Sequence, residues 1–453
     1  MDAAVWELFG HRDYRHLFTA QLSALFGTGL TTVALGLLAY ELAGTGAGAV
    51  LGAALTIKMV TYVTVAPVAA GYAGRVPRRL LLVTLDLARA LVVLALPFVD
   101  QVWQIYLLIA VLQSASAAFT PTFQAVLPDI LPAEGDYTRA LSAAQLASTM
   151  ETLLSPMLAA MLLSVISFHW LFTGTAIGFV ASAALVVTTR IPDAIRSPLT
   201  GVCDRTAAGM RIFAATPRLR GLMGLNLVVA AVGSVVMVNT VNFVRDALGG
   251  SQAEVAVVLA ANGFGTMAAA LALPRILDRT GERPIMTLGA TVSGTGLISA
   301  IALSSAGDSG WRWPIALTVW AVIGAGAGLI LTPAGRVLRR SSRPPDRPAL
   351  FAAQFSLSHL CWLIAYPIAG WLATTTNFTT AWLVLAALAA IGAATAARCW
   401  PRPDPDALEH THHGDEIDPA HVHDAHPVGA GRYRHTHMFV IDDNHRRWPI
   451  TVS

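Results

Sequence analysis

Nine of the thirteen histidines in this chain lie between His410 and His445, close to its C-terminus. They are His410, His412, His413, His421, His423, His426, His435, His437 and His445. Carboxylates are interleaved with them. Neutral imidazole and carboxylate suit Ni(II), Co(II), Zn(II) or Cu(II), whereas Cu(I) prefers the thiolates that residues 400–453 lack. The spacing is irregular and fits no zinc finger, so it predicts a flexible chelating tail rather than one rigid site.

Three further residues that could do chemistry lie near the middle of long apolar stretches: Lys58, Glu151 and His359. An ionisable side chain at the centre of a membrane helix costs at least about 2.5–3.5 kcal/mol, so its presence suggests a function. A carboxylate and an imidazole beside a central cavity could carry a proton or bind a metal cation. The alternative is a structural Lys–Glu pair with a hydrogen-bonded core histidine.

Composition identifies the environment of these residues. The chain has 453 residues, of which 55% are hydrophobic and 13% are charged, and its mean hydropathy is +0.59. A soluble domain carries about 25% charged residues. The composition therefore excludes a soluble enzyme, a nucleic-acid-binding protein and a disordered protein, and it makes the lipid bilayer the main partner. Lys58 is the only lysine, so no ATP-binding loop of the Gly-Lys-Ser/Thr type is present.

Twelve apolar segments are long enough to span a bilayer, which requires about 20 residues each. We predict spans at 17–42, 46–71, 80–99, 103–127, 139–164, 167–189, 219–244, 251–275, 284–304, 313–335, 348–374 and 378–399. Arginines gather in the N-terminus and in every second loop, whereas the opposite loops hold Arg245 and Arg312. Because basic loops remain in the cytoplasm, both termini are expected there.

The segments fall into two sets of six. We divide the chain into an N-terminus at 1–16, a six-helix half at 17–189, a central loop at 190–218, a second half at 219–399 and the tail at 400–453. Residues 140–145 read ALSAAQ and residues 349–354 read ALFAAQ. The loops after spans 2 and 8 also match at a nearly equal offset. These matches predict an all-α membrane protein with two repeated halves.

The two matching loops resemble the signature of the major facilitator superfamily, roughly Gly-x-x-x-Asp-Arg-x-Gly-Arg-Arg. Its residues here are Gly71, Arg75, Arg78 and Arg79 in the first copy, and Asp278, Arg279, Gly281 and Arg283 in the second. The resemblance implies that these residues form a cytoplasmic gate. Gly74 stands where the first copy should have its acid. Asp86 and Arg89, three residues apart on the third span, are expected to pair with each other or with the loop, with a role in the gate as the alternative.

The resemblance also implies which spans meet between the halves. Spans 5 and 8 pack together in that fold, as do spans 2 and 11. Glu151 is then expected to face the region of Asn262, and Lys58 the region of His359. These four residues are our candidates for transport and proton coupling.

Span 11 and the tail, from Arg347 to Trp371 and from His437 to Pro449, are similar to bacterial nickel-resistance exporters of the same superfamily. That resemblance implies efflux of nickel, with cobalt as a second cargo, driven by proton antiport. It implies a multi-pass protein of the inner (plasma) membrane, expected as a monomer, with metal as substrate and tail ligand and no required cofactor. Two alternatives remain: a multidrug or siderophore exporter with a metal-buffering tail, and a metal-sensing receptor that transports nothing.

Overall fold

The computed structural model describes residues 8–73, 75–193, 202–307, 310–413, 425–429, 432–442, 445 and 447–449. Within these ranges, twelve helices are long and apolar enough to cross a membrane. The predicted all-α membrane fold with twelve spans is therefore confirmed.

The first six spans form one bundle. Its helices are α2 (Arg12–Ala43), α3 (Ala47–Ala73), α4 (Arg78–Ala95), α5 (Val102–Ile130), α6 (Glu134–Leu163) and α7 (His169–Val187). Short 3₁₀ turns, η1 (Gly44–Gly46) and η2 (Leu96–Phe98), lie in the connections. The central loop, expected only as a polar connection, contains the helix α8 (Val202–Ala215).

The second bundle follows. Its helices are α9 (Pro217–Ser234), α10 (Thr240–Asn242), α11 (Gln252–Thr280), α12 (Glu282–Ser304), α13 (Arg312–Leu331), α14 (Ala334–Arg340), α15 (Arg347–Pro367), α16 (Ala373–Thr375) and α17 (Phe378–Cys399). The π-helical segments η3 (Val235–Asn239) and η4 (Phe243–Ala247) extend α9, and η6 (Ile368–Leu372) extends α15. The 3₁₀ turn η5 (Pro344–Asp346) precedes α15.

Local sequence signals set several helix ends. The Ser251 hydroxyl accepts from the Glu254 backbone N–H at 3.3 Å, and the Glu254 carboxylate accepts from the Ser251 N–H at 2.6 Å. This capping box begins α11. Gly281 ends the same helix with φ +72°, a left-handed conformation that favours glycine. The glycine of the second loop signature therefore makes the tight turn between α11 and α12.

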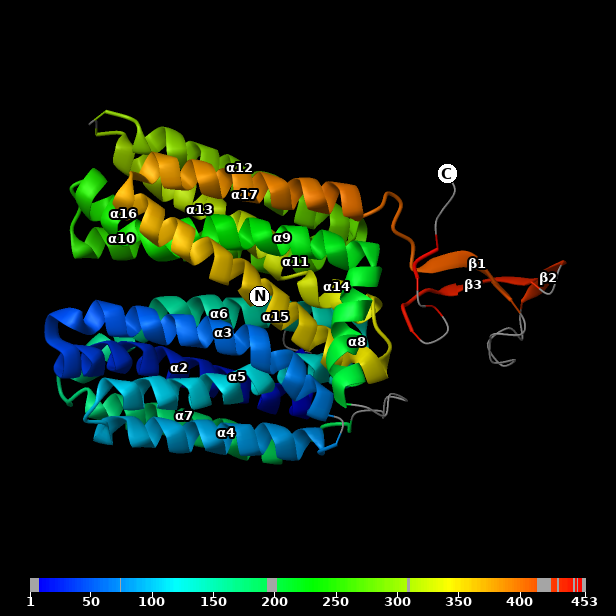
Figure 1. Cartoon of the computed structure of the whole chain (residues 1–453), viewed down its shortest axis with the longest axis horizontal. Helices are drawn as coiled ribbons and strands as arrows, with labels where there is room; N and C mark the ends of the chain where they lie inside the picture. The colour runs from blue at the N-terminus through cyan, green and yellow to red at the C-terminus, as the bar shows by residue number, and fades with distance from the viewer. Residues whose placement is uncertain are drawn as a thin grey trace.

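Figure 1 shows the two bundles side by side, with their helices roughly parallel. Between the bundles, α3 packs on α15 and α6 packs on α11. These are the predicted pairings of spans 2 with 11 and 5 with 8, and both are confirmed. The glycines of span 10 permit close helix approach, since a Cβ on Gly324 would lie 1.9 Å from the backbone oxygen of Asn262.

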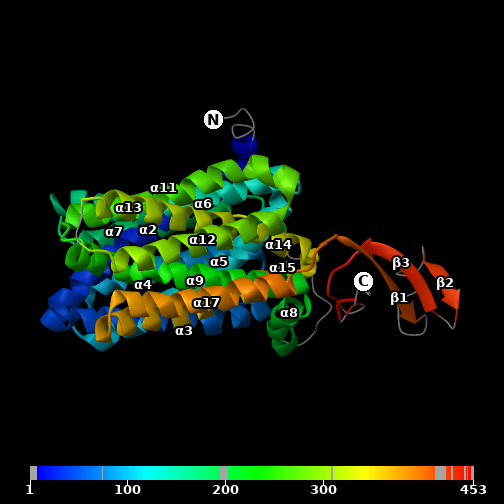
Figure 2. The same cartoon turned by 90° about the horizontal axis from the view of Figure 1, so that it is seen from above.

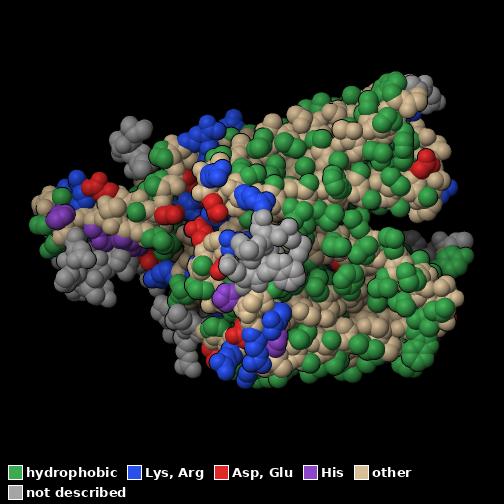
Figure 3. Space-filling model, turned by 180° about the vertical axis from the view of Figure 1, so that it is seen from behind, with side chains coloured by type: hydrophobic (Ala, Val, Ile, Leu, Met, Phe, Trp, Pro, Cys, Tyr) green, Lys and Arg blue, Asp and Glu red, His purple; other side chains and the backbone are tan. Residues whose placement is uncertain are grey.

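The outer surface fits a lipid environment. Large apolar side chains within the spans, such as Leu91, Ile177 and Leu271, are well exposed. Figure 3 shows hydrophobic side chains over the length of the bundles, while Lys and Arg gather at the end that carries the tail. We call this the arginine-rich end. That it faces the cytoplasm stays a prediction from the loop charges.

The expectation of a flexible chelating tail is wrong for the part of it that the structure describes. Three antiparallel strands, β1 (Ala407–His413), β2 (His426–Gly429) and β3 (Arg432–Met438), form a sheet with the order β1-β3-β2. Figure 2 shows this sheet projecting beyond the arginine-rich end. The irregular histidine spacing concealed the strands, because each contributes only every second residue to one face.

Candidate metal centre and gate

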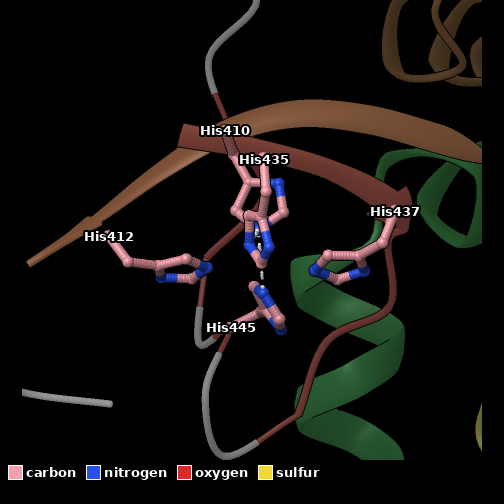
Figure 4. A group of neighbouring side chains, drawn as sticks. All are labelled: His410, His412, His435, His437 and His445. Carbon is pink, nitrogen blue, oxygen red and sulfur yellow. Dashed lines mark hydrogen bonds between the residues drawn. The ribbon is translucent and has the colours of Figure 1, made fainter. Parts of the chain in front are cut away.

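Five histidines of the tail converge on one point. One ring nitrogen from each of His410, His412, His435, His437 and His445 lies within 4.8 Å of the others. Figure 4 shows His410 and His435 pointing toward His445, with His412 and His437 on either side. Imidazole nitrogens in this arrangement are the donors that Ni(II), Co(II), Zn(II) and Cu(II) accept. We name the five residues the histidine centre.

The strand register explains this convergence. His410 lies directly opposite His435 in the β1–β3 pair. His412 and His437 are each two residues further along their own strands, so their side chains emerge on the same face. The signal was present in the sequence as two His-Thr-His triplets, at 410–412 and 435–437. Grouping histidines by proximity along the chain missed it.

His445 comes from outside the sheet and has a fixed orientation. Its Nδ1 lies 2.8 Å from Asp442 Oδ1, which also accepts the His445 backbone N–H at 2.8 Å. Its Nε2 lies 3.0 Å from His410 Nε2, inside the histidine centre. A carboxylate on the far nitrogen of a ligating histidine is the usual arrangement around bound metals, because it holds the ring and raises its basicity.

Electrostatics keep this centre ready for a cation. Burial lowers the pKa of His410 to about 4, and the neighbouring histidines add to the effect. Burial alone would raise the pKa of Asp442. The hydrogen bond from His445 and the charge of Arg343 outweigh it and hold that pKa below its usual value. At neutral pH His410 is therefore uncharged, as a metal ligand must be, and Asp442 is an anion.

The remaining histidines of the tail divide differently from the prediction. His426 is exposed on β2 and pairs with Arg434 in the register, so it lies outside the histidine centre. His413 ends β1. His421 and His423 lie outside the described residues. Among the residues that the structure describes, the nine predicted ligands therefore do not form one equivalent set.

Aspartates dock the tail onto the second bundle. Asp406 Oδ1 lies 2.7 Å from Arg340 Nε and 3.1 Å from Arg218 Nη1. Asp404 Oδ2 lies 3.2 Å from Arg340 Nη2 and accepts from the Trp400 indole at 2.8 Å. Leu408, Phe439 and Ile441 join the hydrophobic core of the second bundle. The base of the sheet is therefore anchored to the second bundle.

The first loop signature acts through a partner that sequence reasoning missed. Arg78, 2% exposed, lies 2.6 Å from Asp129 at the end of α5. The other oxygen of Asp129 forms an ion pair with Arg347 of the second bundle. Gly74 lies outside the described residues. Asp129 thus supplies a carboxylate to the first signature and joins the two halves at the arginine-rich end.

The second loop signature also uses a neighbouring acid. Glu282, 4% exposed, lies 2.8 Å from Arg336 Nε and 2.6 Å from Arg340 Nη1. Arg336 reaches the first bundle as well, through an ion pair with Glu134 and a hydrogen bond of 2.7 Å to Thr138.

The signature residues themselves differ in their surroundings. Asp278, Arg279, Arg75 and Arg79 are exposed, whereas Gly71 is buried. Arg283 Nε donates to the Trp400 carbonyl at 3.1 Å. The predicted pair of Asp86 and Arg89 is confirmed: the two form a buried ion pair on α4, and Ser182 donates to Asp86 at 2.8 Å.

Three of the four membrane candidates lie near one another. Tyr62 lies between Lys58 and His359: the lysine Nζ is 5.6 Å from the tyrosine ring centre, and the two rings are 4.7 Å apart. His359 Nδ1 lies 2.7 Å from the Phe355 carbonyl. Glu151 is near enough to interact electrostatically with Lys58.

Asn262 is turned toward its own bundle. Its amide donates to the Trp320 carbonyl on α13 at 3.0 Å. The roles of Glu151, His359, Lys58 and Asn262 in transport stay predictions.

A cavity of about 410 Å³ lies inside the first bundle. Its lining includes the amides of Gln21, Gln113 and Gln124. The charged residues among the described ones that line it are Lys58 and Arg89, both positive.

Comparison with known proteins places this fold. The Major Facilitator Superfamily model matches residues 17–201 and 222–435, most of the chain. The chain belongs to the Major Facilitator Superfamily. Members of this superfamily are membrane transporters and not enzymes.

Relatives within the superfamily are distant. An uncharacterized MFS-type transporter, YfiS of Bacillus subtilis, is 27% identical over 124 residues, which cover 27% of this chain and 30% of that relative. Among solved structures, the human organic anion transporter MFSD10 has a TM-score of 0.70 at 13% identity, covering 85% of this chain and 99% of that one. A bacterial homologue of the iron transporter ferroportin has a TM-score of 0.69 at 16% identity, covering 85% and 98%. These structures establish the superfamily fold alone.

The Asp442 carboxylate yields a first testable expectation. Asp442→Asn should weaken Ni(II) binding to the purified protein by about 10–100-fold, the usual effect of losing a carboxylate behind a histidine ligand. Titration against a coloured chelator measures it. Glu409→Gln, an exposed change on β1 whose residue lies 3.5 Å from Arg434, is the matched control and should bind as the parent does. Equal affinity in both variants would show that Asp442 does not orient a ligand.

Proposed function

We propose that this transporter exports divalent transition-metal ions, with nickel as the first candidate and cobalt as the second. The histidine centre carries the proposal, because it places five imidazoles at the arginine-rich end. If that end is cytoplasmic, as the loop charges predict, the centre collects metal on the side from which an exporter of the plasma membrane must load it.

The donor set supports nickel over iron. Imidazole sites bind Ni(II) more tightly than Fe(II), while Cu(II) binds more tightly still. The fold likeness to a homologue of the iron transporter ferroportin is compatible with a metal substrate. Because copper would win at the histidine centre, discrimination must lie in the membrane core. We assign that role, and proton antiport, to Glu151 and His359.

Flux into everted vesicles tests this proposal. Vesicles energised by a pH gradient should accumulate Ni(II), and both Glu151→Gln and His359→Ala should reduce the initial rate at least about tenfold while protein levels stay unchanged. The loss is expected because each change removes a group able to hold the proton or the metal at membrane depth. Glu41→Gln and His169→Ala are matched controls, since this Glu and His lie together at the opposite end, 3.9 Å apart.

The outcome is decisive for the assignment. Normal nickel flux in both core variants would return Glu151 and His359 to a structural role. The absence of proton-dependent nickel flux in the unaltered protein would reject the export proposal itself.

The cavity of the first bundle favours a second candidate function, export of an organic anion such as a siderophore. Lys58 gives this cavity a positive charge, while Arg89 is paired with Asp86, and the glutamine amides of the lining offer hydrogen bonds. A bare divalent cation is repelled there, whereas a carboxylate-bearing molecule is attracted. Lys58→Ala should then abolish siderophore flux in the same vesicles.

A further inference from the structure

The tail contacts one connecting segment of the second bundle at two points. This segment, residues 334–347, contains α14, η5 and Arg347, and we name it the latch segment. Asp406 and Asp404 bind Arg340 near its middle, at 2.7 Å and 3.2 Å. Asp442 binds Arg343 a few residues later, with 3.1 Å between Asp442 Oδ2 and Arg343 Nη1. The tail is thus attached to the latch segment twice.

The opposite side of the latch segment holds the first bundle. Arg336 pairs with Glu134 and donates to Thr138 at 2.7 Å. Arg339 donates to the Pro132 carbonyl, and Arg347 pairs with Asp129. A Cβ on Gly335 would lie 2.7 Å from Leu141, which shows how closely the segment sits against α6. The latch segment therefore closes the two halves against each other at the arginine-rich end.

A short chain of contacts joins the histidine centre to this closure. His445 supplies one nitrogen to the centre, and its other ring nitrogen lies 2.8 Å from Asp442. The second oxygen of that carboxylate holds Arg343. Arg343 also lies 3.4 Å from Asp346, which is followed at once by Arg347 and its ion pair across the halves. Only three residues separate Arg343, which holds Asp442, from Arg347, whose ion pair joins the two bundles.

We propose that the histidine centre is a regulatory site, at which a bound divalent metal favours the arrangement closed at the arginine-rich end. The ligand atoms are already assembled in that arrangement. A metal bound there gains its full affinity without reorganisation, and a ligand that prefers one state shifts the population toward it. Opening the halves breaks the pairs of Arg336 and Arg347 with the first bundle and frees the latch segment, which loosens the hold of Arg343 on Asp442 and weakens the centre. Closure and metal affinity must then raise each other by the same factor.

The inference takes from the proposed function the histidine centre as a metal site, and it requires no transport of the metal. Hydrogen–deuterium exchange on the full-length protein, with and without one equivalent of Ni(II), tests it. Backbone amides in residues 334–350 and 129–141 should exchange at least about fivefold more slowly with nickel, the lower range of ordinary allosteric coupling. Vesicle flux is a separate measurement, so a failed export proposal leaves this result intact.

Arg343→Gln separates coupling from binding. It leaves Asp442 on His445, so nickel should still bind within about tenfold of the parent affinity, a loss no larger than that expected for an outer contact. The exchange change in residues 129–141 should fall below about twofold, less than ordinary coupling. Arg432→Gln removes the same charge from an exposed position on β3 and should respond as the parent does. Arg343→Lys, which keeps the charge, should retain part of the response and guards against misfolding of the first variant.

Two results would overturn the inference. One is a parent protein that binds nickel at the histidine centre while exchange in both gate regions stays unchanged. The other is an Arg343→Gln variant that binds nickel and shows the complete exchange response, since that would route the coupling around Arg343.

Discussion

Replacing His410 and His435 together by alanine should lower the affinity of the protein for Ni(II) by about 10⁴-fold. The two residues face each other across β1 and β3, with 3.2 Å between their Nε2 atoms, so both reach the same ion. Structural zinc sites gain about 10–16 kcal/mol from roughly four ligands, or about 2.5–4 kcal/mol each. Two lost ligands remove about 5–8 kcal/mol, and each 1.4 kcal/mol is a factor of ten. His412, His437 and His445 would remain as a weak site.

Competition with a chelator of known affinity measures this loss at neutral pH. His426→Ala is the matched control, because that imidazole is exposed on β2 and lies outside the histidine centre. The parent should bind one equivalent tightly, and the control should do the same. Similar losses in the control and in the double variant would show that the tail binds metal as a diffuse chelator. The order of affinities should place Cu(II) above Ni(II).

The second large effect concerns the gate. Asp129→Asn should shift the protein toward the arrangement open at the arginine-rich end, because one carboxylate holds both Arg78 and Arg347. Removing one partner of a buried ion pair costs about 3–5 kcal/mol. Part of that cost destabilises the open and the closed arrangements equally, and only the remainder shifts the balance between them. We therefore expect at least about a tenfold rise in access to the gate. Transport should fall, because the closed arrangement at that end is then less populated.

Alkylation of a cysteine at Leu141→Cys, followed by mass spectrometry, reports this access, since Leu141 faces Gly335 of the latch segment. Asp278→Asn is the informative comparison. Asp278 is the acid of the superfamily signature, yet it is exposed at the same end. It should change the labelling rate by less than about twofold, the range of an exposed charge. A stronger effect from Asp278→Asn than from Asp129→Asn would show that the signature acid Asp278, and not Asp129, keeps the gate closed.

The fold could be predicted because the bilayer imposes a simple requirement. Each span must satisfy its own backbone hydrogen bonds, so length and apolar content alone locate the helices. The pairing of Asp86 with Arg89 followed from helical spacing in the same way. The packing of span 2 on span 11 rested on the superfamily resemblance, which carried information that composition lacks.

The gate and the histidine centre depend on contacts between distant segments, and no local pattern contains these. Asp129 and Glu282 look like ordinary helix-end acids in the sequence, and only the packed bundles bring them to arginines. The strands of the tail were missed because polar histidine-rich segments carry no hydrophobic alternation. In these strands histidines alternate with other polar residues, and a search for apolar periodicity does not detect that pattern.

The facing His-Thr-His triplets of β1 and β3 restrict how such a tail can diverge. Inserting one residue between His410 and His412 would turn the second imidazole to the other face of the strand, and the ion would lose a ligand although every histidine remained. Positions that point the other way, such as Thr411 and Thr436, are free to change. Counting histidines is therefore a poor guide to the metal capacity of a tail of this kind. A related tail must therefore preserve the even spacing between the histidines of each strand.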